Sequence, residues 1–176
     1  MYLLKEGKDS DKKVQLMGCG TILREVEAAA EILSEEFGVE SDIWSTTSIN
    51  ELRRDAMSVA RENMLNPEAE PKKAYVTECI ESRGEGPVIA STDYMRSYAD
   101  QLREYIPRNF KVLGTDGYGR SDTRTKLREF FEVNRYYVVL AALKALQEEG
   151  KVEGAEVAKA MQKFNINPAK PAPWTV

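Results

Sequence analysis

The chain has 176 residues, of which 42% are hydrophobic and 31% are charged, and its formal net charge is −4 with both signs interspersed. This composition is typical of one globular domain and excludes a disordered chain, and the acidic balance argues against a nucleic-acid partner, which would need a basic stripe. The sequence contains no histidine. It therefore lacks the usual general base near neutral pH and the commonest transition-metal ligand.

Apolar stretches and cysteines narrow the class of protein further. The longest unbroken apolar stretch, YYVVLAAL at residues 136–143, is too short to span a membrane. The first residues have no apolar signal core, so we expect a cytoplasmic protein. Cys19 and Cys79 are too few and too isolated for a disulfide framework or a zinc site, and we predict two reduced thiols.

The first third of the chain shows two strand-then-helix patterns. A short apolar run predicts a strand at 14–18, and Thr21 is a suitable N-cap for a helix over 22–37. A second strand is predicted within 39–47. Ser48 then opens the next helix as part of an S-x-x-E capping box.

The middle of the chain begins irregularly and then repeats the pattern. Residues 65–86 contain two prolines, and the amphipathic piece AYVTECIES predicts a short helix or strand there. A strand is predicted at 87–91 and a helix from about 93 to 106, where Pro107 ends it. A further strand is predicted at 110–114.

The last third is mostly helical. A short helix is predicted around Leu127, and Asn134 is expected to cap a helix over 135–149 that is apolar on most sides and therefore buried. A final helix is predicted at 155–164, before a proline-rich tail that we expect to be non-helical. Strands alternating with helices predict an α/β fold, a single three-layer domain over 1–176 with a mostly parallel sheet flanked by helices.

Two glycine-rich turns follow predicted strands and open predicted helices. They are MGCGT at 17–21 and GTDGYGRSDTR at 114–124. Open α/β sheets bind ligands at such places, where free N–H groups favour an anion. Neither turn has the full dinucleotide pattern, because Leu23 stands where a third glycine would be and Asp116 and Asp122 would repel a phosphate. Tight-turn geometry is the favoured interpretation of MGCGT.

The second turn also carries a dense set of charges. Two carboxylates beside Arg120 and Arg124 favour ion pairs that fix the loop over a metal site, which would need more oxygen ligands. Ser121 or Asp122 is also a candidate cap for the following helix. No catalytic, cofactor-binding or metal-binding residue is identified, because neither cysteine has a histidine partner. The candidate interdomain or anion-contact loop comprises Gly114, Asp116, Gly117, Gly119, Arg120, Ser121, Asp122 and Arg124.

Five blocks of the sequence resemble one known family. They are GTILREV, NELRRDA, GPVIASTDYM, VLGTDGYGRSDTR and FFEVNRYYVV, and together with the tail NPAKPAPWTV they cover nearly the whole chain in order. The chain resembles the C-terminal, transketolase-like domain of homodimeric bacterial pyruvate dehydrogenase, the thiamine-dependent first component of the pyruvate dehydrogenase complex.

The resemblance implies an accessory domain excised from a longer enzyme. In that family thiamine diphosphate and magnesium are bound by two preceding domains, which decarboxylate pyruvate and acetylate the lipoyl group of the dihydrolipoyl acetyltransferase. The implied partners are the remaining domains, the second subunit and the acetyltransferase, with neither nucleic acid nor membrane. The isolated domain would be inactive, hold no cofactor and support assembly, with Arg120, Asp122 and Arg124 making interdomain ion pairs.

Two alternatives remain open at this point. One is a stand-alone α/β module that binds a phosphate-bearing ligand at the glycine-rich turns. The other is an oligomerisation domain that uses the apolar helix at 136–146.

Overall fold

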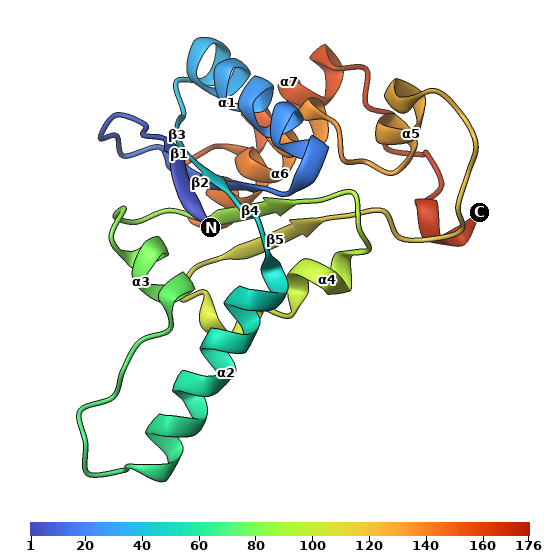
Figure 1. The fold of residues 1–176 in the computed structure, drawn as a ribbon. Coiled ribbons are helices and arrows are strands. Elements are labelled where there is room, and N and C mark those ends of the chain that lie inside the picture. Colours follow the sequence, from blue (N-terminus) through green and yellow to red (C-terminus); the bar gives the residue numbers. More distant parts are fainter.

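In the computed structural model, which describes residues 1–176, five strands form one sheet in the order β1-β3-β2-β4-β5 (Figure 1). The strands are β1 (Tyr2–Lys5), β2 (Lys13–Gly18), β3 (Glu40–Ser45), β4 (Val88–Ser91) and β5 (Phe110–Leu113). The three pairings among β2, β3, β4 and β5 are all parallel, and β1 pairs antiparallel with β3. The predicted mostly parallel sheet is therefore confirmed, with β1 added at its edge.

Seven α-helices and three short 3-10 helices connect and cover the strands. The α-helices are α1 (Leu23–Phe37), α2 (Ile49–Leu65), α3 (Tyr75–Glu81), α4 (Arg96–Asp100), α5 (Arg124–Phe130), α6 (Arg135–Glu148) and α7 (Gly154–Lys163). The 3-10 helices are η1 (Gly20–Ile22), η2 (Arg103–Tyr105) and η3 (Pro173–Thr175). None of the helices is both long enough and apolar enough to cross a bilayer.

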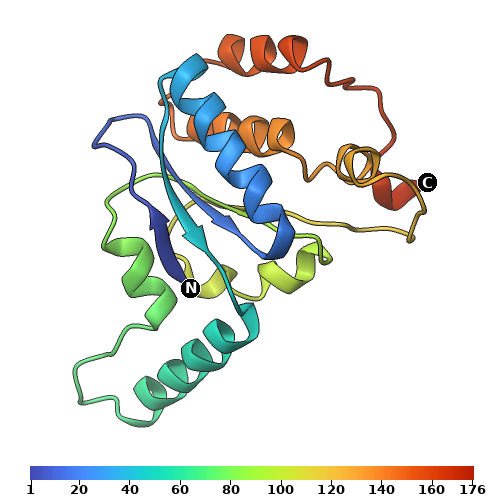
Figure 2. The same cartoon turned by 45° about the horizontal axis from the view of Figure 1, so that its top comes forward.

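The sheet separates two hydrophobic cores, which makes three layers. Helices α1, α6 and α7 lie on one face, and α2, α3 and α4 lie on the other (Figures 1 and 2). The central strands contribute side chains to both cores, because successive side chains along a strand point to opposite faces of the sheet. Leu16 of β2 and Ile43 of β3 enter the first core, whereas Met17 and Trp44 enter the second. The predicted three-layer α/β fold is confirmed.

Two predicted helix caps are confirmed. Ser48 accepts a hydrogen bond from the backbone N–H of Glu51 at 3.3 Å, and α2 begins at the next residue. The Oδ1 of Asn134 accepts from the N–H groups of Tyr136 and Tyr137 at 3.1 and 3.2 Å. Both caps act within three residues of the chain, which is why sequence alone could identify them.

Two predicted caps are wrong. Thr21 does not cap a helix, because its hydroxyl donates to Asp93 and accepts from Arg128, and the chain enters α1 through η1 without a side-chain cap. Helix α5 is capped by Thr123, whose hydroxyl accepts from the N–H of Lys126 at 3.5 Å, and not by Ser121 or Asp122.

The helix predicted over 93–106 is also wrong, because the segment is broken into α4 and η2. The start of α4 is set by a carboxylate that is distant in sequence, since Asp116 Oδ1 accepts from the N–H of Arg96 at 2.8 Å. Met95, which precedes α4, is 60% exposed. The C-terminal tail, predicted to be non-helical, contains the single 3-10 turn η3.

Candidate functional site

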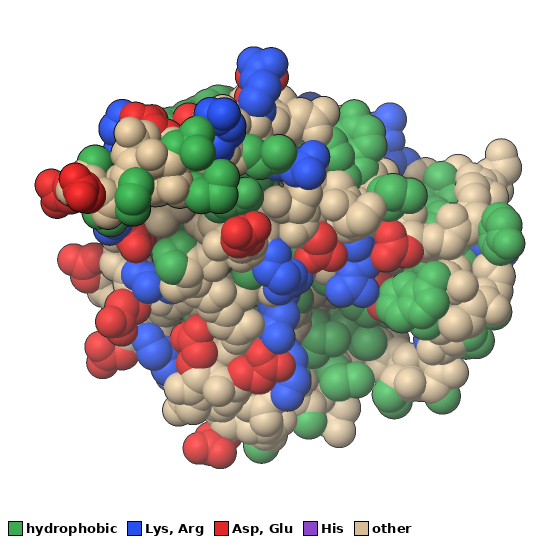
Figure 3. Space-filling model, turned by 90° about the horizontal axis from the view of Figure 1, so that it is seen from below, with side chains coloured by type: hydrophobic (Ala, Val, Ile, Leu, Met, Phe, Trp, Pro, Cys, Tyr) green, Lys and Arg blue, Asp and Glu red, His purple; other side chains and the backbone are tan.

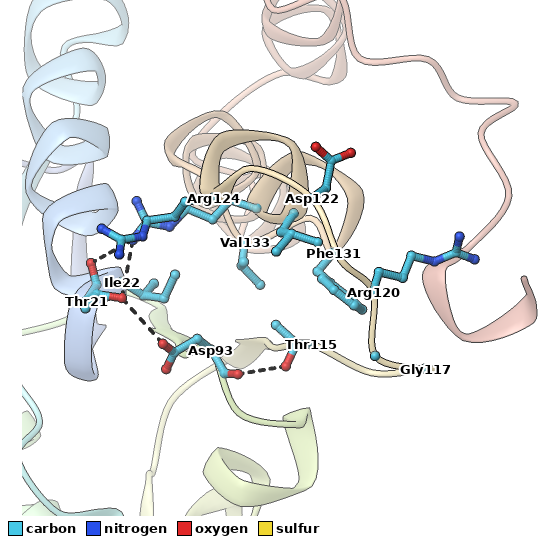
Figure 4. Close-up of a pocket in the computed structure, with 13 residues that line it drawn as sticks. Thr21, Ile22, Asp93, Thr115, Gly117, Arg120, Asp122, Arg124, Phe131 and Val133 are labelled. Atoms are coloured by element: carbon cyan, nitrogen blue, oxygen red, sulfur yellow. Dashed lines mark hydrogen bonds between the residues drawn. The ribbon is translucent and has the colours of Figure 1, made fainter.

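The largest cavity lies at the carboxyl ends of the parallel strands (Figure 4). From β2 the chain moves to β3 on one side, while β4 and β5 lie on the other side of β2, so the topology reverses between β2 and β4. Open α/β sheets form ligand crevices at this point. The cavity measures about 730 Å³ and is lined by residues that follow β2, β4 and β5, together with α5.

One wall of the cavity is polar and its floor is apolar. The hydroxyl of Thr21 donates to Asp93 Oδ2 at 3.4 Å and accepts from Arg128 Nη2 at 3.3 Å. Thr115 donates its hydroxyl hydrogen to the backbone oxygen of Asp93 at 2.8 Å, which ties the loop after β5 to the loop after β4. The apolar lining comes from Ile22, Leu127, Phe131 and Val133.

A buried carboxylate fixes the helices around the cavity. Glu25, only 6% exposed, accepts from Arg128 Nη1 at 2.8 Å and from the Nε and backbone N–H of Arg135 at 3.0 and 2.9 Å. Burial by itself raises the pKa of Glu25, but the hydrogen bonds from Arg135 and the charges of Arg135 and Arg128 outweigh it, so the pKa lies below its usual value. Glu25 therefore joins α1 to α5 and α6 as an anion.

The structure brings only part of the predicted loop into the cavity. Gly117, Gly119, Arg120, Asp122 and Arg124 line it, whereas Gly114, Asp116 and Ser121 do not.

The predicted ion pairs within the loop are wrong. Asp116 bonds to the N–H of Arg96, with its Oδ2 at 4.0 Å from that residue's Nε, and Asp122 Oδ1 accepts from the N–H of Thr123 at 2.6 Å. The guanidinium of Arg120 lies 4.3 Å from the centre of the Phe130 ring. No ion pair joins an arginine of this loop to an aspartate of the same loop.

Two of the loop glycines allow close backbone packing. Gly117 has a φ of +109°, and a Cβ there would lie 2.5 Å from the Pro173 carbonyl oxygen, so this position holds the C-terminal tail against the loop. A Cβ at Gly114 would lie 2.7 Å from both the oxygen of Tyr94 and the nitrogen of Arg96. Both glycines are explained by packing within the domain.

The cavity does not fit a magnesium diphosphate cofactor. The chain places no three His, Cys, Asp or Glu side chains together in a group that could hold a metal ion. Asp93 and Asp122 line the cavity together with three arginines, so the misfit lies in the metal: the two carboxylates do not supply the oxygen ligands that magnesium needs. Cys19 and Cys79 are both free, and burial raises the pKa of the Cys19 thiol, which disfavours the reactive thiolate.

Sequence reasoning did not identify a cluster of exposed apolar side chains beside the loop. Tyr94, Met95, Tyr118 and Trp174 are all more than half exposed, and Tyr118 reaches 82%. They lie together at one edge of the molecule. The backbone oxygen of Tyr94 accepts a hydrogen bond from the N–H of Thr115, and Gly117, next to Tyr118, packs on the backbone of Pro173 and Trp174. We call these four residues the aromatic lip. Their spread over three segments hid the cluster from the sequence.

The fold and sequence together define the class of protein. The family model described as "Transketolase-like TK C-terminal domain" matches residues 1–134, and the chain belongs to this family. A solved structure described as a split-gene transketolase, inactive beta4 tetramer, has a TM-score of 0.53 and 20% identity, covering 83% of this chain and 42% of that one. This likeness shows the fold alone.

Curated relatives give a more particular identification. The chain is 56% identical over 175 residues to a protein of Pseudomonas aeruginosa, 51% over 178 residues to one of Cupriavidus necator, and 47% over 174 residues to one of Escherichia coli K12. All three are named pyruvate dehydrogenase E1 component, and the matches cover 98 to 100% of this chain. The predicted resemblance to pyruvate dehydrogenase is confirmed. The chain spans about a fifth of the length of these relatives.

Proposed function

We propose that residues 1–176 are the single C-terminal domain of a cytoplasmic pyruvate dehydrogenase E1 component. The complete enzyme would decarboxylate pyruvate on thiamine diphosphate with magnesium and acetylate the lipoyl group of the dihydrolipoyl acetyltransferase. This domain would be inactive alone and would support assembly with the other domains and the second subunit. The observation that carries the proposal is an end-to-end match to E1 components that are about five times longer.

The residues that line the cavity support an accessory role for this domain. The cavity has neither a histidine nor a group of side chains that could hold a metal ion. We therefore infer that thiamine diphosphate and magnesium are held by parts of the enzyme outside these residues, where the group would supply the carbanion stabilisation that decarboxylation needs.

The surface beside the cavity supports a role in assembly. Aromatic residues, Met and Arg are enriched in the cores of protein interfaces, and exposed apolar clusters mark such sites. The aromatic lip has this composition, and Figure 3 shows hydrophobic side chains gathered on one side of the lower face beside a column of basic ones. Helix α2 contributes Arg53, Arg54 and Arg61 around a shallow hollow on its surface. Arg120, Asp122 and Arg124 make no ion pair within the domain, so their charges are available to neighbouring domains.

Replacing Tyr118 in the complete enzyme tests this role. Tyr118→Ser should weaken dimerisation, measured by sedimentation, or lower the rate of pyruvate decarboxylation, because it removes an exposed anchor of the lip. A buried aromatic anchor contributes on the order of 2 kcal/mol to an interface. Arg124→Ala is the companion variant for the charged loop.

The isolated chain supplies the control for folding. Because Tyr118 is 82% exposed, Tyr118→Ser should leave the thermal unfolding of the 176-residue chain unchanged. Unaltered dimerisation and activity of both variants in the complete enzyme would contradict the assembly role.

A phosphate-binding module is the second candidate function. The cavity at the switch point of the sheet favours it, since this is where α/β proteins hold ligands. Three arginines and two aspartates line the cavity, so its charge favours an anion with a single negative charge over a phosphate dianion.

A further inference from the structure

Asp93 and Arg124 are two of four charged side chains that line the cavity without an ion-pair partner in the chain; the other two are Asp122 and Arg120, whose guanidinium lies over the Phe130 ring. The side chain of Arg124, the first residue of α5, makes neither a hydrogen bond nor an ion pair within residues 1–176. Asp93 makes no ion pair either, and its carboxylate receives only the hydroxyl of Thr21. Both residues line the cavity at the carboxyl ends of β2 and β4. Both residues are exposed, so the cavity has a cation and an anion that are free to meet the charge of a ligand.

Arg124 differs from its neighbour Arg128 in what it can still bind. Arg128 lies one turn further along α5, with Nη1 on Glu25 at 2.8 Å and Nη2 on the hydroxyl and carbonyl oxygens of Thr21 at 3.3 and 3.4 Å. Both arginines line the cavity (Figure 4). Like charges four residues apart on a helix repel each other, so an anion between the two guanidinium groups would be favourable.

The shape and charge of the cavity select the kind of anion. A guanidinium binds a carboxylate or a phosphate in a two-pronged geometry. Three arginines and two aspartates line the cavity, so one negative charge balances the lining, whereas a dianionic phosphate exceeds it. The floor of Ile22, Leu127 and Phe131 offers apolar contact beside the charged wall. A monocarboxylate on an apolar stem satisfies all three conditions.

We propose that this cavity is a carboxylate site, in which Arg124 holds a single carboxylate and the apolar floor holds the stem that carries it. Such a group has two sources: a free monocarboxylic acid, or an Asp or Glu side chain from the part of the enzyme outside these residues. The second source rests on the proposed function, whereas the site itself does not. Arg124, whose side chain has no partner in the chain, is thereby assigned the role of binding the carboxylate.

The test uses the 176-residue chain and butyrate, a carboxylate on a short apolar stem. Titration is followed by the amide resonances of Thr21, Thr115, Gly117 and Gly119, which line the cavity. We expect saturable shifts confined to these residues. Butylammonium, which has the same stem and the opposite charge, should give none, and inorganic phosphate should bind more weakly.

Matched variants isolate the guanidinium. Arg124→Gln should raise the Kd for butyrate at least about tenfold, the loss expected for one charge-assisted contact. Arg53→Gln, which alters an arginine of α2 that lies outside the cavity, should leave the Kd unchanged. The site is wrong if butyrate produces no saturable shifts, if Arg124→Gln binds as well as the unaltered chain, or if butylammonium binds equally.

The complete enzyme then identifies the source of the carboxylate. Saturation-transfer measurements of butyrate on the complete enzyme should show binding if a free acid is the ligand. Binding to the chain alone and not to the complete enzyme means that a carboxylate of the enzyme itself fills the site. Both results support the carboxylate site, and neither depends on catalytic activity, so failure of the proposed function would be seen separately.

Discussion

Replacing Glu25 by Gln probes the contact that holds α5 and α6 to α1. The carboxylate accepts four hydrogen bonds, one from Arg128 and three from Arg135, at 2.8 to 3.2 Å. Hydrogen bonds to charged groups contribute roughly 1.5–3 kcal/mol each, but the Arg135 side chain is 41% exposed and its share is screened by solvent. We expect Glu25→Gln to lower the free energy of unfolding by about 2 kcal/mol at neutral pH, which is roughly 4–8 °C in Tm for a domain of this size.

The pH dependence separates the charge of Glu25 from its shape. Because the folded state lowers the pKa of Glu25, its stabilisation is present above the unfolded pKa of about 4.3 and is lost as the pH falls through the lower folded value. The difference in Tm between the two proteins should therefore shrink steadily below about pH 4.

Thermal unfolding by circular dichroism from pH 3 to pH 8 measures this difference. Glu27→Gln, an exposed carboxylate on the same helix, is the matched control and should change Tm by less than about 2 °C. A difference for Glu25→Gln that is no larger than that of Glu27→Gln, or that persists undiminished at pH 3, would refute the assignment of the stabilisation to the buried anion.

Two further predictions concern the tail and the alkaline limit of stability. Gly117→Ala should destabilise the chain by about 1–3 kcal/mol, because φ is +109° and the new Cβ would clash with the oxygen of Pro173. Gly119→Ala is the control: its Cβ would meet nothing within 4 Å, so it should have little effect on thermal unfolding. Equal Tm values for the two variants would show that the tail does not pack on the loop. Burial raises the pKa of Tyr137 to about 12, so its stabilisation is present below pH 10 and is lost between pH 10 and 12. Ultraviolet difference titration should show a tyrosine that ionises near pH 12, and Tyr137→Phe should abolish that step.

The fold class could be predicted because its signals are local. Strand pleating and helical periodicity act over a few residues, so the parallel sheet and most helices were placed correctly from apolar spacing. Strand β1 was not predicted because it is an exposed edge of four residues whose only specification is its pairing with β3. The prediction of one helix over 93–106 was wrong for the same kind of reason, a long-range contact: Asp116, twenty residues from Arg96, sets where α4 begins.

The candidate site could be predicted only in part. The glycine-rich loop was placed correctly at the carboxyl end of the sheet, but its aspartates were assigned to the wrong partners. Nothing in the local sequence distinguishes Asp93 or Thr21 from ordinary turn residues. They become part of a site only because β2 and β4 are neighbours in the sheet.

The sequence by itself determined the layered α/β architecture, the Ser48 and Asn134 caps and the family, because each depends on short-range patterns or on matching blocks of residues. The tertiary structure alone decided which charges are paired. Glu25 meets Arg128 and Arg135 across 103 and 110 residues, while Arg124, one helical turn from Arg128, is left without a partner. Electrostatic pairing depends on distance in space and on burial, and neither quantity can be obtained from spacing along the chain.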